Sequence, residues 1–390
     1  MAFNSMGKGA RRLVITSGVA FVAAATLAAC GSSGGGSSSS STPAPAPTTS
    51  GAPAPTTSSA PVEKSKVYFT NNFSDNDWRQ QMQKTVELAA ALPQYADIMT
   101  LEVSNSGVAP EDQAAMIESI IAKGDADAII MEAASPEAVN QAIQNACDAG
   151  IKVVTFDSLA TAPCAWKVAV DWKYNGQVAA AFVAEALGGK GQVAVDYGLK
   201  GLAIGLDFTK GVKEELAKYP GIEIVGEYEG GFNPAQEKSG TAAILASYPD
   251  LAASMTMYVG APAAEAFIAA GKTSYVISGT ANNAGAMQCA GDANQKCVYW
   301  TDSPGISVLA LNVALDAISG KEATPRTLVM DAPNGYFYVK GNTSIAAYPN
   351  ANVSEWTDGV NFYSDQPGSL SLPVLPVGID LPITAADVVG

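Results

Sequence analysis

The stretch DADAIIMEAASPEAVNQAIQNACDAGIKVVTFD, residues 125–157, decides the fold. Its apolar runs at 126–131 and 151–156 have the length and composition of buried strands. Between them, the Ser-Pro-Glu run from Ser135 is typical of a helix start, with Ser as the N-cap and Pro at the first helical position. Apolar residues then recur at helical spacing until Gly150. This strand-helix-strand unit with short connections predicts a parallel sheet covered by helices on both faces.

The same alternation continues on both sides of this stretch. Upstream, β-rich runs at 66–70 and 97–103 flank a helical pattern that begins near Trp78, and a further helix is predicted at 110–124. Beyond residue 171 the pattern resumes, with strands at 192–196, 222–225, 254–259, 275–278 and 298–300 and helices at 175–187, 208–218, 234–246, 262–270 and 305–319. The sequence therefore predicts two α/β lobes. The tail from 331 to 390 is expected to hold one or two strands and otherwise irregular packing on the second lobe.

The composition excludes several functional classes. A chain of 390 residues predicts about two domains with real cores. The 37 acidic residues outnumber the 22 basic ones, which argues against nucleic-acid binding. The absence of His excludes Ser-His-Asp and Cys-His catalysis and every His-ligated metal site. Catalysis by a pair of carboxylates remains open.

The N-terminus predicts an export signal. Three basic residues precede an apolar run at 13–29, which is short for a membrane span. The run ends in LAAC, residues 27–30, which resembles the bacterial lipobox, whose Cys is lipidated. Residues 1–29 are therefore predicted to be a signal peptide and Cys30 the lipidated residue; an ordinary signal with a coincidental Cys is the alternative. The segment 30–62, built after Cys30 almost wholly of Gly, Ser, Thr, Pro and Ala, is predicted to be a flexible linker.

Four further cysteines suit an oxidising compartment. They allow three pairings, and proximity in the sequence favours Cys147 with Cys164 and Cys289 with Cys297. Buried free thiols are the alternative. No pair has the CxxC spacing of a metal site, so no metal is expected.

Polar and aromatic side chains gather where the predicted strands end. In open α/β sheets, ligands bind beyond the carboxyl ends of the strands. Carboxylates, amides and an aromatic face suit a polyhydroxylated ligand, although Asp and Asn also cap helices after strands by default. The candidates are Asn72, Asn76, Asp77, Trp78, Arg79, Asn105, Glu132, Asp157, Asp196 and Asp302.

Together these residues resemble the type I sugar-binding family of bacterial solute-binding proteins that serve ABC transporters, with its ribose, xylose and galactose binders. The resemblance covers about residues 66–330, and its motifs are specific through their order and spacing. They are the loop 76–79, Asn105 with Gln113, the runs 125–130 and 149–157, Val170-Asp171-Trp172 with Gly176, and Gly189-Lys190-Gly191.

The resemblance implies an α/β, two-lobed type I periplasmic-binding-protein fold. Each lobe is then a parallel sheet flanked by helices, and a three-segment hinge joins the lobes near residues 171, 303 and 327. The implied N-terminal lobe comprises 66–171 plus 303–326, and the implied C-terminal lobe 172–302 plus 327–390.

The resemblance also places ligand contacts in this sequence. They fall on Asn72, Asn76, Trp78, Arg79, Asn105, Asp157 and Asp302. Relatives usually carry an Arg where Phe208 or Thr209 stands, and often an Asp after the strand at 275–278, where Gly279-Thr280 follows. Phe208 thus becomes the candidate contact. Losing an Arg fork that grips sugar oxygens suggests a polyol rather than a common pentose or hexose.

The implied protein is a lipid-anchored monomer on the outer face of the cell membrane. It binds a small neutral sugar or sugar alcohol and delivers it to an ABC transporter permease, without cofactor, metal or enzymatic activity. A sugar sensor for a signalling system is the first alternative. A glycosidase that uses Asp157 and Asp302 as its carboxylate pair is the second. Which sugar binds is left open.

Overall fold

The computed structural model describes residues 63–321, 327–330, 336–340, 352–376 and 379–389. The predicted signal peptide, Cys30 and the whole of the predicted linker lie outside these residues. No helix in the described ranges is long and apolar enough to cross a membrane.

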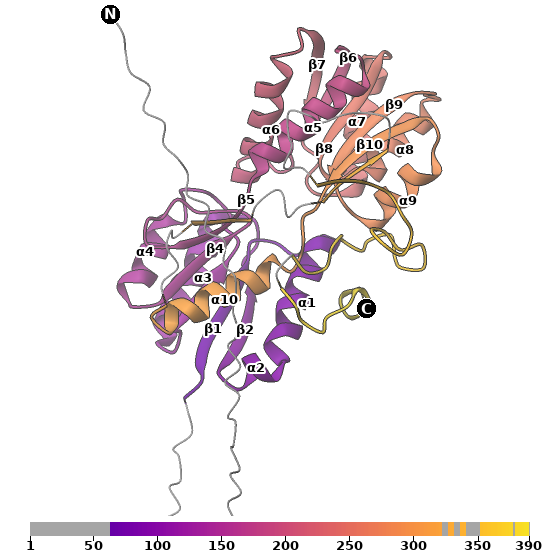
Figure 1. The fold of residues 1–390 in the computed structure, drawn as a ribbon. Coiled ribbons are helices and arrows are strands. Elements are labelled where there is room, and N and C mark those ends of the chain that lie inside the picture. The colour runs from indigo at the N-terminus through magenta and orange to yellow at the C-terminus, as the bar shows by residue number, and fades with distance from the viewer. Residues whose placement is uncertain (1–62, 322–326, 331–335, 341–351, 377–378, 390) are drawn as a thin grey trace, which may run out of the picture. The chain divides into compact units, whose positions relative to one another are not determined.

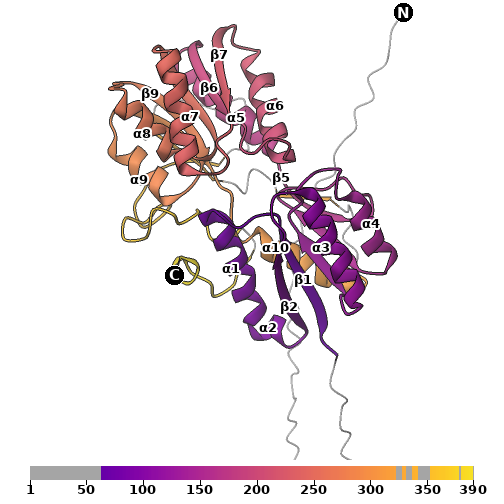
Figure 2. The same cartoon turned by 180° about the vertical axis from the view of Figure 1, so that it is seen from behind.

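The first lobe is a six-stranded, all-parallel sheet in the order β11-β5-β4-β3-β1-β2. Alternate residues of β1 point to opposite faces: Val67 and Phe69 join one core cluster and Tyr68 the other. Helices α1 and α10 cover the first face, and α3 and α4 the second (Figures 1 and 2). The elements are β1 (Ser65–Asn71), α1 (Asp77–Ala91), α2 (Pro93–Ala96), β2 (Met99–Asn105), α3 (Pro110–Lys123), β3 (Ala128–Met131), α4 (Asn140–Asp148), β4 (Lys152–Phe156), β5 (Trp166–Val170), α10 (Ile306–Ile318) and β11 (Thr327–Met330).

The second lobe is a seven-stranded sheet in the order β13-β12-β10-β9-β8-β6-β7, parallel except where β12 runs antiparallel to β10. Helices α5 and α6 can approach closely because Gly176 and Gly211 have no Cβ. A Cβ at either position would clash with the backbone of the other helix. The elements are α5 (Trp172–Ala186), β6 (Lys190–Asp196), α6 (Ala203–Leu216), β7 (Gly221–Tyr228), α7 (Pro234–Ser247), β8 (Leu251–Val259), α8 (Ala261–Ala269), β9 (Tyr275–Thr280), α9 (Asn283–Gly291), β10 (Gln295–Trp300), β12 (Tyr336–Lys340), β13 (Asn352–Glu355) and α11 (Ala385–Val388).

The chain crosses between the two lobes more than once, and one crossover differs from the expected boundaries. The chain leaves the first sheet after β5 and returns with α10, which packs on β3, β4 and β5. The expected division assigned everything from residue 327 to the second lobe. Instead, β11 pairs with β5 in parallel, Thr327 opposite Lys167, so this strand belongs to the first sheet. The third crossover therefore lies between Met330 and Tyr336.

Several local elements also differ from the sequence-based prediction. Strand β5 and helix α9 were not predicted. Helix α4 begins at Asn140 rather than directly after Ser135, because the Ser135 hydroxyl accepts the backbone N–H of Ala138 at 3.1 Å and caps a separate turn.

The sulfur atoms of Cys147 and Cys164 lie at bonding distance, as do those of Cys289 and Cys297.

The C-terminal tail contacts both lobes, whereas it was expected to pack on the second alone. The Gln81 side chain on α1 donates to the Ser369 carbonyl at 2.7 Å and accepts the Ser371 N–H at 2.9 Å. On α9, the Asn283 side chain accepts the Tyr363 N–H and donates to carbonyls at 363, 366 and 367. The tail therefore connects α1 to α9.

Candidate functional site

A small cavity lies at the carboxyl ends of strands from both sheets. Its free volume is about 20 Å³, which is room for about one water molecule, so a larger solute can enter only if its walls move apart. Five expected residues line it: Asn76, Trp78, Arg79, Asp157 and Asp302. Six further residues complete the lining: Trp172, Ile204, Phe232, Met257, Tyr258 and Thr280.

The buried guanidinium of Arg79 organises the first-lobe side. Asn76 caps α1 by accepting the backbone N–H of Arg79 at 2.8 Å, which fixes where the side chain leaves the helix. The Arg79 side chain is 3% exposed, and its Nη1 donates to Asn71 at 2.8 Å and Asn72 at 2.9 Å. It also forms an ion pair with Glu132. Burial lowers the pKa of Arg79 to about 10, so the group remains charged at neutral pH.

Aromatic rings surround this cation. The Arg79 guanidinium lies 4.5 Å from the centre of the Phe73 ring and 5.5 Å from that of Trp78. Both distances fall within the range of cation–π attraction. Trp78 is held by its indole N–H, which donates to the Asp302 carbonyl at 2.7 Å. The first-lobe side thus combines a fixed charge with flat apolar faces.

Two buried carboxylates face the cavity. Asp157 adopts a left-handed backbone conformation, with φ of 51°, and accepts the Trp172 indole N–H at 3.1 Å. Burial raises the pKa of Asp157, and the charge of Arg79 opposes that rise. Asp302 is 8% exposed, and its Oδ1 is buried without a hydrogen-bond partner. Burial and the charge of Asp157 raise the pKa of Asp302 well above its ordinary value.

Apolar side chains form the second-lobe wall. Phe232, with φ of 51°, stacks on Phe73 of the first lobe at 6.3 Å between ring centres. Its ring meets Tyr258 edge-on at 6.2 Å, and its carbonyl accepts the Asn76 side-chain N–H at 3.4 Å. Ile204 and Met257 add aliphatic surface. This side therefore offers mainly shape and apolar contact, and its polar groups at the cavity are the hydroxyls of Tyr258 and Thr280 and the carboxyl of Asp302.

Asp196 stands behind this wall rather than in it. Its carboxylate accepts the backbone N–H groups of Gly198 at 2.8 Å, Gly230 at 2.7 Å and Met257 at 3.1 Å. Gly198 and Gly230 follow the ends of β6 and β7, and Met257 lies within β8 near its end. A Cβ at Gly230 would lie 2.6 Å from the carboxylate, which explains the glycine there. Burial raises the pKa of Asp196 to about 6. Asp196 therefore positions Met257 and the loop that carries Phe232.

Several expected residues do not reach the cavity. Asn72 and Glu132 are buried and act through Arg79. Asp77 is exposed in the first turn of α1 because only one side of that turn faces the cavity. Asn105 ends the edge strand β2, is exposed and donates to Gln83 at 3.2 Å.

Phe208 is also placed away from the cavity. Its ring lies 5.2 Å from that of Trp300 and is fully buried in the second-lobe core. Sequence reasoning also missed the apolar lining residues. Met257, Tyr258 and Thr280 also lie near the carboxyl ends of strands, where ligands are expected. They were missed because such residues are equally common in a protein core. The signal for Phe232 was the Gly230-Gly231 pair after β7.

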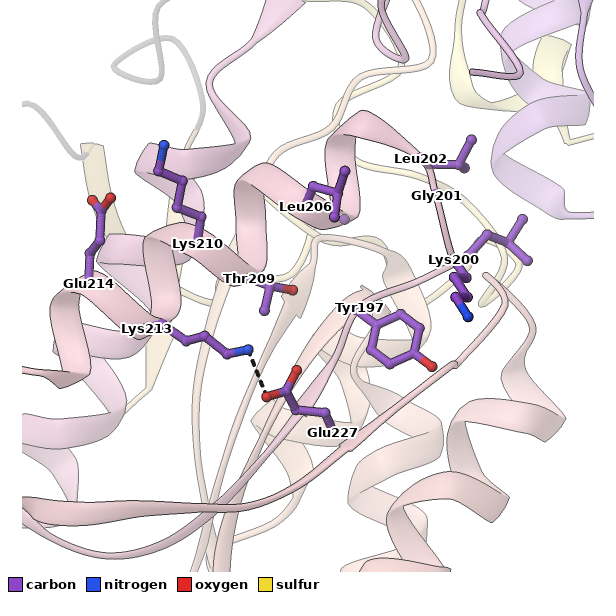
Figure 3. A pocket seen from close by; sticks show the side chains of 12 residues that line it. Tyr197, Lys200, Gly201, Leu202, Leu206, Thr209, Lys210, Lys213, Glu214 and Glu227 are labelled. Carbon is purple, nitrogen blue, oxygen red and sulfur yellow. Dashed lines mark ion pairs between the residues drawn. The ribbon is translucent and has the colours of Figure 1, made fainter. Parts of the chain in front are cut away.

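A larger hollow of about 460 Å³ lies elsewhere on the second lobe, over α6 and β7 (Figure 3). Leu206, 61% exposed, and Tyr197 line it, and Lys213 forms an ion pair with Glu227 across it at 2.8 Å. Its charged groups are solvated, and none of its lining side chains is a buried carboxylate. The strand-end cavity, although smaller, holds the buried charges and is the candidate site.

Comparisons with known proteins identify the family of the chain. Residues 67–322 match the family described as periplasmic binding protein domain. An ABC transporter solute-binding protein from Thermobispora bispora is 31% identical, with a TM-score of 0.63 over 68% of this chain and 84% of that one. No curated protein matches the chain.

Two more distant structures show the same fold. A periplasmic solute-binding protein from Actinobacillus succinogenes with bound D-allose is 24% identical, with a TM-score of 0.62 over 70% of this chain and 97% of that one. A fructose-binding periplasmic domain of a hybrid two-component system is 18% identical, with a TM-score of 0.61 over 70% and 90%.

Proposed function

Because the chain belongs to the periplasmic binding protein domain family, we propose that it captures a monosaccharide or sugar alcohol in the strand-end cavity and delivers it to an ABC permease. One observation carries the proposal: Arg79, Asp157 and Asp302 meet in one cavity beside the faces of Trp78 and Trp172. Charged groups hydrogen-bond hydroxyls strongly, and aromatic faces cover the C–H surface of a sugar ring. The bound D-allose of the neighbour from Actinobacillus succinogenes supports the ligand class.

Binding proceeds through separation and closure of the two lobes. The cavity is too small for a sugar as it stands, and contacts such as that of Phe73 with Phe232 join its two sides. Parting the lobes would break these contacts and admit the solute. Closure then excludes water, which strengthens the hydrogen bonds made by the buried charges.

The remaining features belong to the same proposal. Residues 1–29 direct export, Cys30 carries the lipid, and 30–62 tether a monomeric body to the outer face of the membrane. Two disulfides, Cys147 with Cys164 and Cys289 with Cys297, stabilise it, which the spacing of the sulfur atoms supports. No cofactor, metal or catalytic step is part of the proposal.

Transport and sensing share this fold. The fructose-binding neighbour belongs to a two-component system, whereas the structure at 31% identity is an ABC transporter solute-binding protein. The higher identity favours transport. Deleting the gene should abolish uptake of the solute; unchanged uptake together with a lost transcriptional response would favour a sensor.

Binding is tested on the exported chain with a thermal-shift panel of monosaccharides and sugar alcohols, followed by calorimetry. At least one compound should bind with a micromolar dissociation constant. Trp78→Ala should abolish this binding while the protein stays folded, because it removes the aromatic face over the solute. Asp77→Ala, a change at the adjacent exposed position, should leave the affinity unchanged. A panel without a single binder, or full affinity in Trp78→Ala, would refute the proposed site.

A further inference from the structure

The cavity carries more buried negative charge than positive charge. Arg79 is the one cationic residue among those that line it, and Asp157 and Asp302 line it too. Glu132, fully buried, already forms an ion pair with Arg79 from behind. With Arg79 matched by Glu132, neither Asp157 nor Asp302 has a cation of its own. Buried charges are costly unless they are paired.

We propose that the solute carries a protonated amine beside its hydroxyl groups, as an amino sugar or an amino polyol does. This inference rests on the proposed function and names the solute class for the same cavity. It replaces the neutral ligand expected from the sequence.

The hydrogen bonds already made point to where the ammonium group sits. Arg79 Nη1 donates to Asn71 and Asn72 and forms the ion pair with Glu132, and Asp157 Oδ1 accepts the Trp172 indole N–H. Asp302 Oδ1, by contrast, is buried and unpartnered in a residue that lines the cavity. An ammonium has three donors and no acceptor, which matches a carboxylate that lacks a donor.

The aromatic walls favour the same group. Trp78, Trp172 and Tyr258 all line the cavity, and ring faces attract a desolvated cation. The second-lobe residues Ile204, Phe232 and Met257 bring no positive charge that would repel it. A solute with an amine therefore meets complementary groups on both sides.

Binding of an amine should also change the number of protons bound by the cavity residues. Without solute, burial and the charge of Asp157 raise the pKa of Asp302, which favours its protonated form. The other titratable groups at the cavity are Arg79, which stays charged, and Tyr258, whose pKa is raised by burial; Glu132 lies behind. An ammonium beside Asp302 would favour the ionised carboxylate and lower this pKa, so binding should release protons into solvent. A neutral sugar would instead accept a hydrogen bond from the protonated carboxyl and release no proton.

The test uses matched pairs of solutes that differ in one amine: glucosamine with glucose, galactosamine with galactose, and 1-amino-1-deoxysorbitol with sorbitol. Calorimetry on the exported chain at pH 7 should show one amine binding at least about 10-fold tighter than its neutral partner, as expected for a charge-assisted pair. Repeating the titration in buffers of different ionisation enthalpy should show a net release of protons on binding.

Asp302→Asn should remove both the preference for the amine and the proton release, whereas Asp77→Asn, the same change at an exposed position, should keep both. Thermal unfolding shows whether each variant is folded, and proton release in the unaltered protein tests the inference without any variant. A neutral partner that binds as tightly as its amine, or amine binding without proton release, would overturn the inference and leave the proposed function standing. If no compound of either class binds, the proposed function itself fails.

Discussion

The two sides of the cavity are built from similar α/β lobes, yet they use their buried charge differently. The first lobe points Arg79 and Asp157 at the cavity. The second lobe lines it mainly with apolar side chains such as Ile204, Phe232 and Met257, and adds Asp302 from the end of β10. It keeps another carboxylate, that of Asp196, one layer behind, bonded to three backbone N–H groups. A polar residue at a strand end can thus serve a site by facing the solute or by holding the loops that do.

This difference predicts a ranking of effects. Removing a group of the first-lobe side deletes a direct contact and leaves its buried partners uncompensated, so both affinity and stability should fall sharply. Removing the Asp196 carboxylate should loosen the second-lobe wall of the cavity without deleting a direct contact with the solute. Removing a side chain that only holds the tail should change local stability and leave the cavity nearly intact.

Arg79→Met should have the largest effect. It leaves the buried carboxylate of Glu132 without its ion-pair partner, which typically costs about 3–5 kcal/mol of stability, and solute affinity should fall more than about 100-fold. Urea unfolding and calorimetry measure the two quantities. Arg79→Lys keeps the charge without the planar fork and should recover part of both. Lys84→Met, an exposed cation on the same helix, is the control. Affinity of Arg79→Met within threefold of the original would remove the first-lobe side from the binding site.

Asp196→Asn should have an intermediate effect. The amide still offers one acceptor oxygen, but its NH₂ group faces a backbone donor, which costs about 1–3 kcal/mol. Affinity should fall about 3- to 10-fold although Asp196 does not line the cavity, because the loops that position Phe232 and Met257 relax. Asp77→Asn is the charge-matched control. Unchanged affinity in a destabilised Asp196→Asn would confine Asp196 to a structural role.

Asp196 should also make the stability of the protein depend on pH. The pKa of Asp196 is raised from 3.8 to about 6 in the folded protein, so the folded state holds this proton more tightly than the unfolded state. Stability relative to Asp196→Asn should therefore be highest near pH 4, fall as the pH rises to about 6, and level off above. The total change is about 3 kcal/mol. Urea midpoints of both proteins across this range measure it; a difference that rises with pH would contradict the assignment.

The fold could be predicted because its signal is periodic and repeated. The stretch 125–157 contains two buried strands and a helix, and the structure places β3 and β4 side by side within it. Strand β5 was missed because Trp166 and Lys167 interrupt a run of only five residues. The start of α4 was misplaced because the N-cap pattern at Ser135 serves a turn instead. Local patterns do not reveal which backbone groups a cap will satisfy.

The site could be predicted at its polar residues and at Trp78, but not along its apolar wall. The strand-end rule found Arg79, Asp157 and Asp302 because buried charge is unusual in a core. It could not identify Ile204 or Met257, since an apolar residue at the edge of a cavity has the same composition as one in a core. Asn105 follows the same rule but ends an edge strand, and its side chain bonds Gln83 outside the cavity.

The smallest effects are expected where the two lobes hold the tail. Asn283 makes four hydrogen bonds to the segment 363–367, and Gln81 makes two to Ser369 and Ser371. At about 1 kcal/mol for each net hydrogen bond, Asn283→Ala should expose the tail more than Gln81→Ala, with solute affinity changed less than about threefold in either. Hydrogen exchange of the tail amides measures the opening. Greater exchange in Gln81→Ala than in Asn283→Ala would mean that α1, and so the first lobe, holds the tail more firmly; a tenfold loss of affinity in either would mean that the tail also sets the geometry of the cavity.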